Sequence, residues 1–188
     1  MSRAYAILGL GFIILMAGTW FLVRSNESIT SSSRSMPMAL SLVSPAFAPG
    51  GLIPVRYTCE GGDSSPPLII EGAPDGTKSL VLTMDDPDAP VGTWAHWVLY
   101  NIPPETTEIA ENVAPPGTLI GLNSWNKNDY GGPCPPDKEH RYIFKLYALD
   151  TMLDLPPEST TKEILEETLQ GHVLAEAELI GRYDKASR

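Results

Sequence analysis

The chain has 188 residues, enough for one domain with a short appendage, and 43% hydrophobic and 19% charged residues are ordinary for a globular protein. Its formal net charge of −10 argues against nucleic acid as a partner and against a basic, membrane-surface role. The 18 prolines and 16 glycines favour a loop-rich fold built mainly of strands.

The N-terminus begins with an uncharged apolar stretch from Ala4 to Val23, which is long enough to cross a bilayer as a helix. We expect residues 1–25 to be a hydrophobic signal anchor or a signal peptide, and both alternatives stay open. Residues 26–38 are rich in serine and are expected to form a flexible linker. The folded domain should therefore span residues 39–188, lie outside the cytoplasm, and be exported or attached to the membrane through the N-terminal segment.

Short apolar runs between proline- and glycine-rich turns predict a series of strands in the folded domain. The expected strands are residues 39–44, an edge strand at 53–59, 68–71, 80–84, 93–101 and 140–149. The acidic run Asp85–Pro90 is expected to be a loop between two of them, because prolines interrupt a strand. Period-two alternation then places Trp94, His96, Val98 and Tyr100 on one face.

One helix is expected near the C-terminus. Thr160 and Glu163 have the spacing of a capping box, an apolar stripe follows them, and Gly171 ends the helix. Residues 172–183 fit either an extension of this helix or a returning strand.

Four ionisable side chains beside the turns are candidates for a site: Asp86, Asp88, His96 and His140. Two imidazoles and a carboxylate around a small pocket suit anion binding or acid–base chemistry. The alternative is that each aspartate caps its own loop and each histidine is a satisfied core group. The same residues could hold zinc, but no HxxxH or HxH pair supports a metal, and we expect neither metal nor cofactor.

Cys59 and Cys134 are the two cysteines of the chain. An exported domain would permit them to form a disulfide, whereas two separate buried thiols are the alternative. Several aromatic side chains fit either an apolar wall of the pocket or the ordinary core: Trp94, Trp97, Tyr100, Trp125 and Tyr142.

The motifs DDPDAP followed by TWAHWVLYNIP, and GGPCPP followed by HRYIFKLYALD, resemble the phosphatidylethanolamine-binding protein family, also called Raf-kinase-inhibitor-like. The resemblance extends over Leu40 to Tyr183, and its compact loops resemble the bacterial and archaeal branch. It implies a mostly β fold, a large antiparallel sheet packed on a smaller one with few short helices. It also implies a ligand-binding pocket made of Asp86, Asp88, Pro90, Trp94, His96, Pro135, Pro136, His140 and Tyr142.

The resemblance makes a binding protein for a small phosphate-like anion or phosphoethanolamine headgroup the first expectation, not an enzyme. Because histidine protonation would favour an anion, binding is expected to weaken as the pH rises from about 5 to 8. An inhibitor of a protease, kinase or other enzyme that uses the same pocket is the second expectation. A phosphoester hydrolase with Asp86, His96 and His140 as acid and base is the third.

Overall fold

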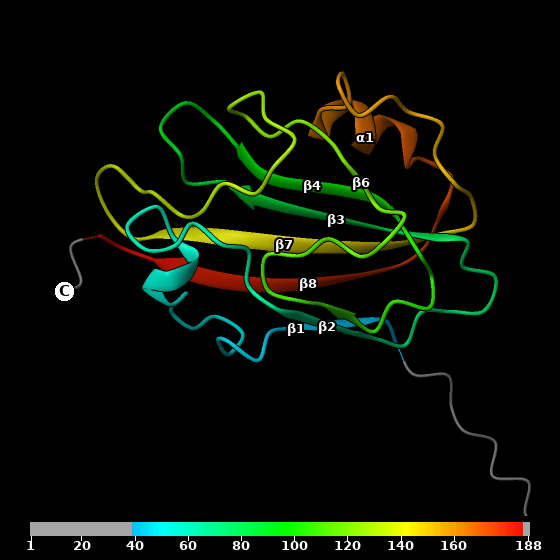
Figure 1. Cartoon of the computed structure of the whole chain (residues 1–188), viewed down its shortest axis with the longest axis horizontal. Coiled ribbons are helices and arrows are strands. Elements are labelled where there is room, and N and C mark those ends of the chain that lie inside the picture. Colours follow the sequence, from blue (N-terminus) through cyan, green and yellow to red (C-terminus); the bar gives the residue numbers. More distant parts are fainter. Residues whose placement is uncertain (1–38, 186–188) are drawn as a thin grey trace, which may run out of the picture. The chain divides into compact units, whose positions relative to one another are not determined.

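The computed structural model describes residues 39–185, in which eight strands form two antiparallel sheets (Figure 1). The larger sheet has the order β6–β4–β3–β7–β8, and the smaller has the order β1–β2–β5. The predicted N-terminal segment 1–25 and linker 26–38 lie outside the described residues. The strands are β1 (Ser41–Val43), β2 (Leu68–Glu71), β3 (Ser79–Asp86), β4 (Trp94–Ile102), β5 (Glu108–Ile109), β6 (Leu119–Ile120), β7 (His140–Leu149) and β8 (Val173–Tyr183).

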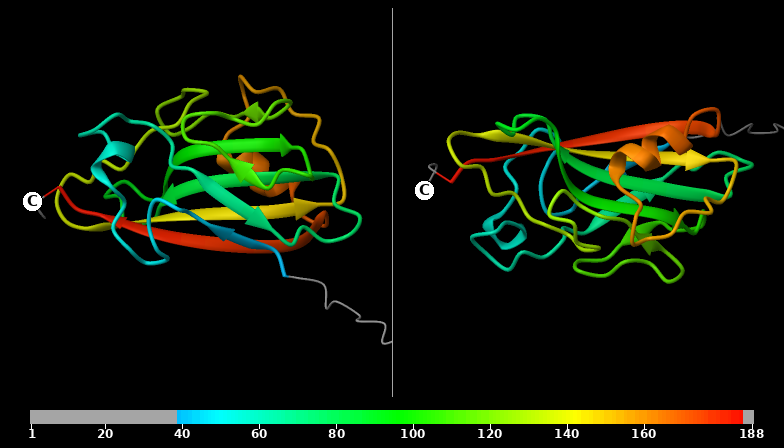
Figure 2. Two further views of the ribbon diagram at one scale, coloured as in Figure 1. Left: turned by 60° about the horizontal axis from the view of Figure 1, so that its bottom comes forward. Right: turned by 90° about the horizontal axis from the view of Figure 1, so that it is seen from above.

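Strand β3 is the centre of the large sheet and is buried along its whole length, which explains why four of the five residues from Leu80 to Met84 are apolar. One of its faces, with Leu80, Leu82 and Met84, packs against the small sheet. Its opposite face, with Val81, packs beneath helix α1 (Lys162–Thr168). The left view of Figure 2 shows β1 and β2 in front of the large sheet and α1 behind it. This arrangement confirms the predicted fold class.

Helix α1 is short and begins one residue later than the capping pattern predicted. Thr161 is its N-cap, with a hydroxyl that accepts from the amide of Ile164, whereas the hydroxyl of Thr160 donates to the carbonyl of Pro156. Gly171, with φ of +84°, follows the helix as predicted. No helix among residues 39–185 is long and apolar enough to cross a membrane.

The C-terminal segment returns as a strand, because β8 pairs with β7 along almost its full length, from His140–Tyr183 to Leu149–Val173. The alternation predicted for β7 is confirmed. Its even-numbered residues from 140 to 148 are buried, and its odd-numbered residues from 141 to 147 lie on the opposite, more exposed face.

Two predicted boundaries were wrong. Residues Val55–Tyr57 form a 3-10 turn instead of an edge strand, because the amides of Tyr57 and Thr58 donate to carbonyls three residues back. Asp85 and Asp86 were assigned to a loop, but they pair with Ala95 and Trp94 and continue β3 up to Pro87. The strand ends there because proline has no amide hydrogen to donate.

A β-bulge at His96 also overturns the predicted alternation in β4. Met84 pairs with Trp97, whereas the next residue, Asp85, pairs with Ala95, so His96 is the extra residue. Ala95 therefore joins the core beneath α1, while Trp97 lies in the core between the sheets. His96 is turned away from the face that it was predicted to share with Val98 and Tyr100, and its ring contacts Tyr142 of β7.

Candidate functional site

A cavity of about 210 Å³ lies where three neighbouring strands of the large sheet begin or end. Asp86 is the last residue of β3, Trp94 the first of β4 and His140 the first of β7. Because these strands are antiparallel neighbours, the end of β3 lies beside the starts of β4 and β7, and the three residues meet at one end of the sheet. The cavity is lined by Asp86, Ala89, Pro90, Val91, Trp94, His96, Trp125, Cys134, Pro136 and His140.

His140 is held between two carboxylates. Its Nδ1 lies 2.7 Å from Oδ2 of Asp86, and its Nε2 lies 3.0 Å from Oδ1 of Asp137. Because carboxylates only accept hydrogen bonds, both ring nitrogens are donors when both contacts form, which is the imidazolium state. Burial by itself lowers the pKa of His140, but these two hydrogen bonds outweigh it and raise the pKa above its ordinary value.

His96 has the opposite environment. Its Nδ1 donates to the carbonyl oxygen of Gly131 at 2.6 Å, which leaves Nε2 as the second ring nitrogen. The ring lies edge-on between Trp125 and Tyr142, with centroid distances of 5.0 and 5.2 Å. Burial among these aromatic rings lowers the pKa of His96 despite the carbonyl contact. The neutral imidazole of His96 therefore presents an acceptor, whereas both ring nitrogens of His140 are donors that bind carboxylates.

Two buried polar atoms near the histidines have no hydrogen-bond partner within residues 39–185: Nε1 of Trp94 and the hydroxyl of Tyr142. Burial also raises the pKa of Tyr142 well above its usual value, so its hydroxyl stays protonated. An unpaired buried donor costs free energy unless a ligand or water satisfies it. Trp94 lines the cavity, and its indole N–H is a donor that a bound ligand or water could satisfy.

The loop after β3 is fastened to the start of β7 by an ion pair. The carboxylate of Asp88 accepts from the Arg141 amide at 3.0 Å and from the Arg141 guanidinium at 2.9 and 2.8 Å. The amide of Asp88 in turn donates to Oδ1 of Asp86 at 2.8 Å. These contacts fix the loop that carries Ala89, Pro90 and Val91, and hydrogen bonds from Arg141 hold the pKa of Asp88 far below its usual range.

The opposite wall of the cavity is braced by a disulfide between Cys59 and Cys134, whose Cα atoms are 5.5 Å apart. The amide of Cys59 also donates to the carbonyl of Pro133. Trp125 packs directly on Gly131, where a Cβ atom would lie only 2.4 Å from the indole ring. Glycine is required there, because any side chain would displace the tryptophan that forms the wall.

Comparison with known proteins identifies the family to which this fold belongs. The family model described as phosphatidylethanolamine-binding protein matches residues 43–184, which include every residue that lines the cavity. The chain belongs to the phosphatidylethanolamine-binding protein family.

Bacterial and archaeal members of this family resemble the chain over most of its length. The UPF0098 protein of Methanothermobacter thermautotrophicus is 50% identical over 149 residues, covering 77% of this chain and 98% of that protein. A crystal structure of a phosphatidylethanolamine-binding protein homolog from Chlamydia trachomatis has a TM-score of 0.75 and 43% identity, covering 78% of this chain and 98% of that one. The crystal structure of E. coli YbcL, described as a new member of the mammalian family, has a TM-score of 0.73 and 31% identity, covering 78% of this chain and 99% of that one.

Six of the nine residues that the family resemblance assigned to the pocket line the cavity: Asp86, Pro90, Trp94, His96, Pro136 and His140. The other three lie outside its lining. Asp88 is engaged with Arg141, Tyr142 is buried beneath the ring of His96, and Pro135 is buried in the segment before Pro136.

Sequence reasoning named Trp125 as a candidate for the apolar wall, and Trp125 does line the cavity, but it omitted Ala89, Val91 and Cys134 from the pocket and gave Asp137 no part in the site. No sequence signal distinguishes Asp137 from the other exposed acidic residues. Within residues 39–185, no cluster of three or more His, Cys, Asp or Glu side chains is arranged to hold a metal ion.

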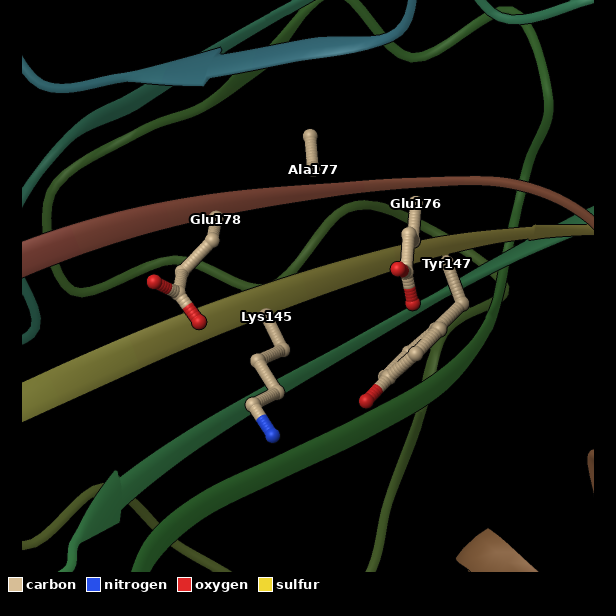
Figure 3. A pocket seen from close by; sticks show the side chains of 5 residues that line it. All are labelled: Lys145, Tyr147, Glu176, Ala177 and Glu178. Carbon is tan, nitrogen blue, oxygen red and sulfur yellow. The ribbon is translucent and has the colours of Figure 1, made fainter.

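A second hollow of about 270 Å³ lies on the opposite, outer face of β7 and β8 (Figure 3). Lys145 and Tyr147 of β7 and Glu176 and Glu178 of β8 project from this face, whereas Ala177 points to the other side. The hollow contains neither histidine nor a tryptophan. The histidine-lined cavity is therefore the better candidate for a ligand site.

Proposed function

We propose that this domain binds a small phosphate-bearing molecule of the phosphoethanolamine type in the cavity between His96 and His140. The proposal is supported by the family, by the cavity at the strand ends, and by the complementary states of the two histidines. His140 is an imidazolium donor, and His96 is a neutral acceptor through Nε2. This pair suits a ligand that carries both an anionic oxygen and an O–H or N–H group.

The observation that carries the proposal is the pairing of His140 with Asp86. The Asp86 side chain is 5% exposed, and the side chain of His140 is fully buried. A buried carboxylate at 2.7 Å favours the charged form of the imidazole and fixes the orientation of the ring. A phosphate that replaces one carboxylate on His140 would gain a charged donor there, and the unpaired indole N–H of Trp94 would add a neutral donor.

Calorimetric titration of the protein with phosphoethanolamine at pH 6 tests this function. His140→Gln should weaken binding at least ten-fold, because a charge-assisted hydrogen bond contributes about 1.5–3 kcal/mol. His172→Gln is the matched control, since His172 lies at the far end of β7–β8 and pairs with Asp150. Equal affinity in all three proteins would refute the proposal, provided that circular dichroism shows them folded.

A protein inhibitor that uses the same cavity is the second candidate, and the rim of the cavity favours it. Val91 is 78% exposed and Trp125 is 42% exposed, so apolar groups stand at the entrance, where a partner could bury them. In this case a side chain or terminus of a protease or other enzyme would occupy the cavity. A partner captured by the wild type and lost with Asp86→Ala would favour inhibition over binding of a small molecule.

We further propose that the domain is not an enzyme. Both nitrogens of His140 and Nδ1 of His96 are engaged, which leaves Nε2 of His96 as the one ring nitrogen of the pair available for proton transfer. Highly purified protein should therefore leave phosphomonoesters and phosphodiesters intact. Turnover that is lost in His96→Gln would instead support the phosphoester hydrolase.

We also propose that the domain is exported or anchored with its folded part outside the cytoplasm. The disulfide between Cys59 and Cys134 supports this location, because disulfides persist in oxidising compartments. Mass spectrometry of the protein from its own cells would test it, since a retained disulfide and the mature N-terminus would both be visible. Free thiols in freshly isolated protein would count against it.

A further inference from the structure

Asp137 occupies the ring nitrogen through which His140 would bind an anion. Its Oδ1 lies 3.0 Å from Nε2 of His140, three residues along the chain, and the same oxygen accepts from the amide of Lys138. Nδ1 of His140 is already engaged by Asp86. A phosphate that takes a hydrogen bond from His140 therefore has to replace one of these two carboxylates.

The two carboxylates differ in how easily they can be replaced. The Asp86 side chain is 5% exposed, and its other oxygen accepts from the amide of Asp88, so both of its oxygens are held in place. The Asp137 side chain is 56% exposed and lies in the loop before β7. A carboxylate that leaves Nε2 from that position regains its water at little cost, because it is already half solvated.

When a ligand displaces Asp137 from Nε2 of His140, the negative charge of the Asp137 carboxylate remains beside the site. Asp86 and Asp137 together carry two negative charges against one positive charge on His140, so a simple anion is repelled as it enters. A ligand with an ammonium group two carbons from its phosphate would instead pair that group with the displaced carboxylate. The rings of Trp94 and Trp125, with centroids 5.4 Å apart, add aromatic surface that favours a cation.

We propose that Asp137 is an internal competitor for Nε2 of His140 and that it selects ligands carrying both a phosphate and a primary ammonium group. In the free protein, Asp137 holds the position of the ligand's phosphate. In the complex, the phosphate takes that hydrogen bond and Asp137 receives the ammonium. This inference rests on the proposed function, and it assigns to one loop residue the discrimination between a zwitterion and a plain phosphate.

A matched pair of ligands isolates the ammonium. Phosphoethanolamine and n-propyl phosphate have the same length and differ in one group, NH₃⁺ or CH₃. The full-length protein should bind phosphoethanolamine several-fold more tightly than propyl phosphate in calorimetric titrations at pH 6. Asp137→Ala should bind propyl phosphate about ten-fold more tightly than the wild type, since removal of the competitor frees a charge-assisted donor. The same variant should lose the preference for phosphoethanolamine.

Glu139→Gln is the control for a general change in charge. Glu139 lies two residues from Asp137 but pairs with Arg182 at 2.7 Å, so its substitution removes one negative charge without freeing His140. This variant should keep the wild-type preference and change either affinity less than two-fold, because exposed charges are screened. Asp137→Asn, which retains a weaker, neutral acceptor, should fall between the wild type and Asp137→Ala.

The outcomes of these titrations distinguish the proposed role of Asp137 from the proposed phosphate site itself. Binding of both ligands with unchanged affinities and preference in Asp137→Ala would overturn the role of Asp137 and leave the phosphate site intact. Absence of binding by either ligand in every variant would overturn both proposals. Vesicles of phosphatidylethanolamine, compared with phosphatidylcholine vesicles, distinguish the source: specific retention on the former indicates a lipid headgroup, and binding of soluble phosphoethanolamine without such retention indicates a free metabolite.

Discussion

His96 and His140 line one cavity, yet their surroundings shift their pKa values in opposite directions. Burial beside Trp125 and Tyr142 lowers the pKa of His96, whereas hydrogen bonds to Asp86 and Asp137 raise the pKa of His140 against the effect of its burial. Between their two pKa values the pair therefore consists of one neutral and one charged imidazole. Such a pair can accept and donate in the same small space, which neither histidine could do alone.

The first prediction concerns these two protonation states directly. NMR titration of the ring signals should place the pKa of His140 above about 6.5 and that of His96 below it. Asp86→Asn should lower the pKa of His140, because it removes a carboxylate at 2.7 Å. Two histidines that titrate together near their ordinary value would contradict the assigned environments.

The second prediction is the pH dependence of binding. Because burial lowers the pKa of His96, the change comes from His140, and affinity should weaken as the pH rises through the raised pKa of His140, above the ordinary imidazole value of about 6.5. This range is narrower and higher than the fall from pH 5 to 8 expected from two ordinary histidines. Glycerophosphoethanolamine is a suitable calorimetric probe, because its own ionisation is constant here. Affinity that falls between pH 5 and 6 would point to His96 instead.

The third prediction concerns Asp85, which is 3% exposed beneath α1 and has one oxygen without a partner in the described part of the chain. Burial raises its pKa to about 6, so Asp85 favours folding at low pH, and this contribution is lost as the pH rises through about 6. Asp85→Asn should therefore increase the free energy of unfolding at pH 8 by up to about 3 kcal/mol. Urea unfolding should show the gain shrinking toward zero near pH 4. A loss of stability at pH 8 would show that the ion pair with Lys162, at 3.6 Å, outweighs burial.

The fourth prediction concerns the disulfide. Cys59 and Cys134 are 75 residues apart, so their replacement by serine should lower the free energy of unfolding by about 4 kcal/mol in the chain-entropy model. Because Cys134 also lines the cavity, loss of the disulfide should make this part of the cavity wall more mobile and weaken the binding of phosphoethanolamine. Urea unfolding and calorimetry of the double variant measure both effects. Wild-type stability in the double variant, or in protein treated with a reductant, would contradict this role.

Much of the fold could be predicted from local pattern. The alternation from His140 to Leu149 follows from burial on one face, and the mainly apolar run from Leu80 to Met84 follows from burial on both faces. The 3-10 turn at Val55–Tyr57 could not, because local amide-to-carbonyl bonds replaced the strand pairing that its residues favour. The bulge at His96 could not be predicted from local pattern either, because it depends on the register in which β4 pairs with β3.

The site shows the same division between local and long-range information. The family motifs carried the two histidines, Trp94 and Asp86, all of which line the cavity. They did not reveal that Asp88 is paired with Arg141, because that contact joins residues 53 positions apart. The carboxylate of Asp137 on His140 was also unexpected. A separation of three residues, as between Asp137 and His140, does not by itself predict a contact in a loop, and only the geometry of the loop brings the two side chains together.

The most direct test of the central claim is an NMR titration with phosphoethanolamine at pH 6 that follows the imidazole signals and the indole N–H of Trp94. Ligand bound in the cavity should shift the signals of His140, His96 and Trp94 along one saturable curve and leave exposed His172 unchanged. Cavity signals that stay fixed while ligand binds elsewhere, or that never change up to millimolar concentrations typical of weak ligands, would contradict a phosphate site between the two histidines.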